Sequence, residues 1–92
     1  MHAVLVTVSI EPGRVEEAQA QLETNVLPRV KEIPGVVSGY WTRSADGEHG
    51  SAMVIFESEE AARTAADNLP NMPRPDFVTF DNVEVREVVA QV

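Results

Sequence analysis

The middle of the chain carries the pattern that decides the fold, "GVVSGYWTRSADGEHGSAMVIFES" at residues 35–58. Residues 36–43 and 51–56 are rich in β-branched and aromatic side chains, which favours two strands. The loop between them contains Asp46-Gly47, a pair typical of hairpin turns, although this loop is longer than the tightest type. The stretch is therefore predicted to form a hairpin of two antiparallel strands.

A helix is predicted on each side of this hairpin. Upstream, apolar residues recur at intervals of three and four, which is the spacing of one helical stripe, at positions 15, 18, 22, 26, 30 and 33. Pro28 interrupts the stripe and should kink or break the helix near residues 24–27, because proline lacks the backbone donor and clashes with the preceding turn. Downstream, Ser58 followed by Glu59 and Glu60 is typical of a helix start, and small residues at 61, 62, 65 and 66 allow close packing on a sheet.

The two outermost segments are predicted as strands. In residues 2–10, side chains point alternately to the two faces of a strand, and both faces include apolar residues. This run is too short to cross a bilayer, and it lacks the basic start of a secretion signal. Residues 83–89 form the last predicted strand. The Pro-rich segment 70–77 cannot continue a helix, and we expect a stiff loop that covers the neighbouring surface.

The resulting order is β-α-β-β-α-β in a single domain spanning residues 1–92. Right-handed crossovers place both helices on one face of a four-stranded antiparallel sheet, which is a ferredoxin-like α+β sandwich. The strands carry apolar residues on their other face as well, and an apolar patch of that size usually marks an interface. We therefore expect a second copy of the chain to cover it, with two sheets facing each other around an interior space.

Composition limits the partners. The net charge of −8 argues against nucleic acid and against a membrane surface, because both require clustered basic residues. The absence of Cys excludes disulfides and thiolate metal sites, which agrees with a cytoplasmic location. A chain of 92 residues buries a small core, so association with a copy of itself would add stability.

Several segments together resemble the dimeric α/β-barrel superfamily, namely "GRVEEAQ", "VLPRVKEIPGVVSGYWTRSADGEHG", "VIFESEEAARTAA" and "VEVREVV". In particular, the chain is similar to small bacterial proteins grouped with antibiotic biosynthesis monooxygenases, many of which have no assigned reaction. The likeness covers nearly the whole chain. Its most specific parts are Pro34-Gly35 and "FESEEAA" at residues 56–62, which mark a strand start and a helix start. These are structural marks, so they support the fold more than a chemistry.

The resemblance implies a homodimer with a cavity, either between the sheet and its helices or within the shared barrel. It also implies an oxygenase that needs no metal or flavin and acts on aromatic or polyketide-like substrates. Other relatives degrade haem with an Asn on the first strand, a Trp and an iron-ligating His. Here Thr7 and Ser9 stand where that Asn would be sought, Trp41 is on the second strand and His49 is in the hairpin loop, which argues against haem degradation.

Five residues are predicted to shape a ligand site, with core or interface packing as the alternative for each: Trp41, Thr7, Met53, Leu5 and Tyr40. Tyr40 and Trp41 are neighbours in a strand, so their side chains point to opposite faces and cannot form one wall. The sequence leaves open which of the two faces the cavity.

Two residues are candidates for catalysis. Arg43 shares the parity of Trp41 and could reach an anionic ligand, or it could be a strand-end arginine in water. His49 is the only plausible general base at neutral pH, or a solvated loop residue. His2 and His49 lack the spacing of a metal motif, and we expect neither metal nor cofactor.

Two functions follow. The first is an oxygenase of small aromatic molecules that needs no cofactor. The second is a non-catalytic ligand-binding or structural homodimer, in which the same residues fill the interior. The expected partners are a second copy of the chain and a small apolar or aromatic ligand.

Overall fold

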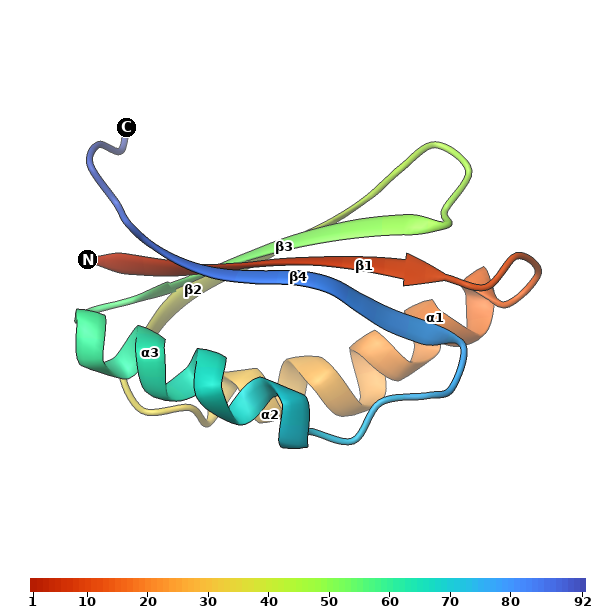
Figure 1. The fold of residues 1–92 in the computed structure, drawn as a ribbon, viewed down its shortest axis with the longest axis horizontal. Coiled ribbons are helices and arrows are strands. Elements are labelled where there is room, and N and C mark those ends of the chain that lie inside the picture. Colours follow the sequence, from red (N-terminus) through yellow and green to blue (C-terminus); the bar gives the residue numbers. More distant parts are fainter.

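A computed structural model describes residues 1–92 and has two layers, a sheet and a layer of helices under one face of it (Figure 1). The strands are β1 (His2–Ile10), β2 (Val36–Arg43), β3 (His49–Phe56) and β4 (Val78–Glu87). They form one antiparallel sheet in the order β2-β3-β1-β4. The helices are α1 (Val15–Gln21), η1 (Leu22–Val26), α2 (Leu27–Lys31), α3 (Glu59–Asn68) and η2 (Leu69–Asn71). The predicted ferredoxin-like fold is confirmed.

The face of the sheet toward the helices is apolar because alternate residues of each strand point to it. In the central strand β1 these are Val4, Val6, Val8 and Ile10. Val4 is paired with Val54 of β3 on one side and Val85 of β4 on the other. The core lies on this face, with Val4, Val6, Val54, Phe56 and Ala62 as its buried centre.

The first predicted helix is interrupted where Pro28 led us to expect a kink. Residues Leu22–Val26 form a wider π-helical turn between α1 and α2, and Pro28 follows in the first turn of α2. Proline cannot donate to the carbonyl four residues earlier, and its ring crowds that group. The wider turn accommodates this without ending the helix.

The second predicted helix begins as expected. Ser58 is its N-cap, and the Ser58 hydroxyl oxygen accepts a hydrogen bond of 3.1 Å from the backbone N–H of Ala61. Ala62 is fully buried against the sheet, so the helix packs close through its small residues. None of the helices is both long and apolar enough to span a membrane.

The predicted start of the last strand, residue 83, was wrong: β4 begins five residues earlier, at Val78. Its pairing with β1 shifts between Thr7 and Val8, where Thr7 pairs with Asn82 but Val8 pairs with Phe80. Asp81 is the extra residue of this β-bulge. An extra residue breaks the alternation of apolar and polar side chains, so a sequence pattern with a period of two residues does not identify the first half of the strand. The third strand also begins earlier than predicted, at His49.

Candidate functional site

A cavity of about 500 Å³ lies between the helix-facing side of the sheet and the helices. That volume is within the range of roughly 300–1,000 Å³ of pockets that hold small molecules. Of the 28 residues that line it, 18 are hydrophobic, and they come from all four strands, from the helices and from the loop before β4. The cavity is thus an apolar chamber inside one chain, with few polar groups.

Trp41 is the aromatic wall contributed by the edge strand β2. It pairs with Ala52 of β3 and lies on the helix-facing side, whereas its neighbour Tyr40 pairs with Met53 on the other side. A Cβ atom at Gly39 would lie only 2.7 Å from Cζ3 of the Trp41 indole. The missing side chain at Gly39 therefore lets the indole lie along the strand, where it lines the cavity.

Arg43, two residues further, lies on the same side of β2. Its partner in β3 is Gly50, and a Cβ atom there would lie 3.5 Å from Nε of Arg43. The Arg43 side chain is half-buried, and its Nη1 is shielded from solvent without any hydrogen-bond partner. A buried guanidinium nitrogen without an acceptor is costly, and Arg43 carries one in a residue that lines the cavity.

The π-helical turn brings a pair of amides to the cavity. Asn25 and Gln21 both line it, and Nδ2 of Asn25 donates to Oε1 of Gln21. Asn25 thus bonds to a side chain and not to the backbone groups that Pro28 leaves free. Neither residue was a predicted site residue, because the facing of a helix side chain shifts across a π turn and the sequence does not show where that turn lies.

The other four predicted ligand-binding residues lie on the opposite face of the sheet. Leu5 pairs with Met53 and Met53 pairs with Tyr40, so these three form one row across β1, β3 and β2. Thr7 lies in the next row, opposite Ser51. None of the four lines the cavity. Their role as ligand residues stays a prediction for the space between two facing sheets.

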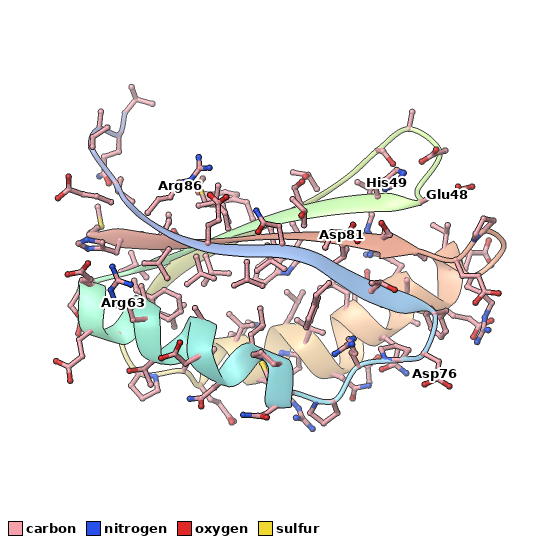
Figure 2. The ribbon with its side chains drawn as sticks, viewed as in Figure 1. Glu48, His49, Arg63, Asp76, Asp81 and Arg86 are labelled. Carbon is pink, nitrogen blue, oxygen red and sulfur yellow. The ribbon has the colours of Figure 1, made fainter.

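The two histidines also lie outside the cavity. His49 is the first residue of β3 and pairs with Ser9, and Figure 2 shows it at the hairpin end on the side of the sheet away from the helices. His2 lies at the start of β1, with its Nε2 4.0 Å from a carboxylate oxygen of Glu59. Trp41 and Arg43 are therefore together in one site, and His49 is not with them. No group of three or more His, Asp or Glu side chains is arranged to hold a metal ion.

The pKa shifts that the structure causes belong to surface groups. A hydrogen bond from Arg14 lowers the pKa of Glu17, and one from Arg63 lowers the pKa of Glu59. The pKa of Glu84 is lowered by hydrogen bonds from Asn82 and then from Arg86. None of these acids lines the cavity, so carboxylates do not offset the charge of the arginines there.

No family model matches the chain, and no curated protein sequence matches it. Solved structures do match over almost the whole chain. MhuD, a heme-degrader from Mycobacterium tuberculosis with two hemes bound in its active site, is 18% identical; the match covers 100% of this chain and 99% of MhuD, with a TM-score of 0.78.

Two oxygenases match in the same way. SnoaB, a cofactor-independent oxygenase from Streptomyces nogalater, is 15% identical over 99% of this chain and 96% of its own, with a TM-score of 0.68. The ActVA-Orf6 monooxygenase from Streptomyces coelicolor, in complex with nanaomycin D, is 17% identical over 99% of this chain and 89% of its own, with a TM-score of 0.64. At these identities the likeness is one of fold. The chain shares its ferredoxin-like fold with these three proteins, as the resemblance in its sequence implied.

Proposed function

We propose that the protein binds a small aromatic or polyketide-like molecule in the cavity beneath its sheet and oxidises it with O₂ without metal or flavin. The observation that carries the proposal is the cavity itself: about 500 Å³, mostly apolar, with the indole of Trp41 and the guanidinium of Arg43 on one wall. An aromatic ring system can stack on or pack edge-on against that indole. The fold shared with SnoaB and ActVA-Orf6 supports the reaction class.

The reaction must suit a cavity without a side-chain base. The lining contains no His, Asp, Glu or Lys, so no group there takes a proton readily at neutral pH. The substrate of such a site is one that loses its own proton to water, as an acidic phenol or enol does. The oxidation of a ring CH₂ group to a carbonyl then consumes one O₂ and releases one water, so oxygen supplies both the inserted atom and the electron acceptor.

An anthrone is the simplest probe, because its central CH₂ group undergoes this oxidation and the product absorbs at longer wavelength. We expect the protein to raise the rate of O₂ uptake above the spontaneous rate. Ala65→Leu, which adds bulk to a residue of α3 that lines the cavity, should abolish the increase. Ala20→Leu, the same change at an exposed position of α1, should not.

The two variants also separate the two functions. Anthrone binding that Ala65→Leu weakens, with no rate above the spontaneous one, would mean that the protein is a non-catalytic binding protein. Absence of binding to the unmodified protein would exclude a ligand site in the cavity for this class of molecule. Haem degradation is not proposed, because neither His2 nor His49 lines the cavity and so no histidine is placed there to ligate iron.

We also propose that two copies pack through the sheet faces that carry no helices. Tyr40 and Met53 expose 62% and 41% of their surface there, next to Leu5. Large apolar side chains in one continuous row usually mark an interface. Residues of the same face, Thr7 among them, would line the space between the two sheets.

A further inference from the structure

The charges around the cavity are distributed unlike those of the rest of the molecule. The chain has 15 acidic and seven basic residues, yet three of the basic residues and none of the acidic ones line the cavity. The three are Arg29 of α2, Arg43 of β2 and Arg74 of the loop before β4. An acidic protein therefore encloses a chamber whose only charges are positive.

The arginines of this chain fall into two groups by their partners. Outside the cavity, Arg14, Arg63 and Arg86 each form an ion pair with a glutamate, Glu17, Glu59 and Glu84 respectively. The three arginines that line the cavity form none. Because acidic residues outnumber basic ones about two to one, an arginine on the surface easily finds a carboxylate. The three arginines without a carboxylate partner are the same three that line the cavity.

Arg43 is distinguished from the other two by burial. Arg29 and Arg74 are exposed, whereas Arg43 is half-buried and its Nη1 is both shielded from water and without an acceptor. Arg74 already has partners within the lining: its Nε donates to the carbonyl of Val78 at 3.3 Å, and its guanidinium lies 5.0 Å from the centre of the Phe80 ring. The one guanidinium of the lining that is not exposed is thus that of Arg43, two residues from Trp41 on the same side of β2.

We infer that the ligand of this cavity is an aromatic carboxylate, seated with its ring system against Trp41 and its carboxylate on the guanidinium of Arg43. This inference rests on the proposed function, since it names the class of molecule that the same cavity takes. A carboxylate matches the planar fork of a guanidinium and can accept two parallel hydrogen bonds from it. A polyphosphate would need several buried donors, and the largely apolar lining offers only one guanidinium that is not exposed.

The exposed arginines have a different role in this arrangement. Arg29 and Arg74 lie at the solvent-exposed part of the lining, where they counter the repulsion that a net charge of −8 exerts on an approaching anion. Such charges act over distances of about 10 Å at 0.1 M salt and change association rates more than the bound geometry. Arg43 is accordingly the binding residue, and Arg29 and Arg74 assist the approach of the ligand.

The test uses two probes of nearly equal shape, anthracene-2-carboxylate and its neutral amide, anthracene-2-carboxamide. Trp41 is the only tryptophan of the chain and lines the cavity, so quenching of its fluorescence measures binding of either probe to the intact protein. At pH 7 we expect the carboxylate to bind at least about tenfold more tightly than the amide, because one charge-assisted hydrogen-bonded pair provides that much affinity.

Three variants locate the preference. Arg43→Gln should remove the preference for the carboxylate over the amide, because it should lower the affinity for the carboxylate alone. Unchanged affinity for the amide shows that the variant is folded. Arg43→Lys should keep part of the preference, because it keeps the charge without the fork. Arg63→Gln removes an exposed arginine of α3 that lies outside the cavity, and it should change neither affinity.

The outcomes separate this inference from the proposed function. Equal affinity for the two probes, or a preference that survives Arg43→Gln, would overturn the inference while the cavity remains a ligand site. Failure of both probes to quench Trp41 in the unmodified protein would overturn the proposed binding site and the inference with it.

Discussion

Gly39 and Gly50 shape the wall of the cavity because they have no side chain. Each lies on the helix-facing side of its strand, one beneath the Trp41 indole and the other opposite Arg43. A Cβ atom would lie 2.7 Å from the indole at Gly39 and 3.5 Å from Nε of Arg43 at Gly50. Glycine at these two positions converts a surface that would be filled with side chains into a site where a ring and a guanidinium are accessible.

Gly39→Ala tests this at the scale of one residue. The new Cβ atom would lie 2.7 and 2.8 Å from two atoms of the indole, so Trp41 must move. We expect the free energy of unfolding to fall by about 1–3 kcal/mol, the usual cost of overpacking. In a Trp41→Leu background the same change should cost little or add stability, because alanine restricts the unfolded chain more than glycine does. Urea denaturation of the four proteins measures both; equal losses in both backgrounds would exclude the contact as the cause.

At the scale of elements, the β2–β3 hairpin is held by the side chains of its loop. Oδ1 of Asp46 accepts hydrogen bonds from the Ser44 hydroxyl at 2.6 Å and from the backbone N–H of Glu48 at 2.9 Å. These bonds, that from Ser44 first, lower the pKa of Asp46 below its ordinary value. The loop thereby sets the register that places Trp41 opposite Ala52 and Arg43 opposite Gly50.

Asp46→Asn should therefore destabilise the protein in a way that depends on pH. A carboxyl whose pKa is lower in the folded protein stabilises it above the unfolded pKa of about 3.9, and this stabilisation is lost as pH falls through the folded value. We expect a lower melting temperature than that of the unmodified protein at pH 7, and a difference that shrinks as pH falls below about 3.9 and through the folded pKa. Asp67→Asn, at an exposed position of α3, serves as the matched control. A deficit that persists at low pH would point to the loop backbone instead.

The whole molecule has one covered and one bare sheet face, and the bare face carries the proposed association. Met53→Asp places a charge in the middle of the row formed by Tyr40, Met53 and Leu5. Two copies meeting through this row would each bury that charge, which is unfavourable without a partner. We expect the unmodified protein to have twice the 10.1 kDa mass of one chain at micromolar concentration, and the variant to have that of a single chain.

Light scattering coupled to size-exclusion chromatography measures these masses. Thr64→Asp, at an exposed position of α3 on the other side of the molecule, should leave the dimer intact. An unmodified protein that is monomeric at micromolar concentration would contradict association through any face. Dissociation by Thr64→Asp but not by Met53→Asp would place the contact on the helices.

Much of the fold follows from local patterns in the chain. Alternation in β1 and β2, the stripe of α1 and α2, the interruption before Pro28 and the cap at Ser58 each depend on residues within a few positions of one another. Backbone sterics and the pairing of nearby donors are local, so the sequence alone determined these elements, their order and the opposite facing of Tyr40 and Trp41. The start of β4 could not be predicted from the sequence, because the bulge at Asp81 depends on pairing with β1, a strand distant in the sequence.

Only the tertiary structure decided which parity of β2 faces the helices, and hence that Trp41 and Arg43 share a cavity that His49 does not enter. It also decided that Arg29 and Arg74, 45 positions apart in the sequence, line the same chamber as Arg43 without an acid among them. The physical reason is that a cavity and its net charge arise from side chains on separate elements, and their distances are set by how sheet and helices pack rather than by their spacing along the chain.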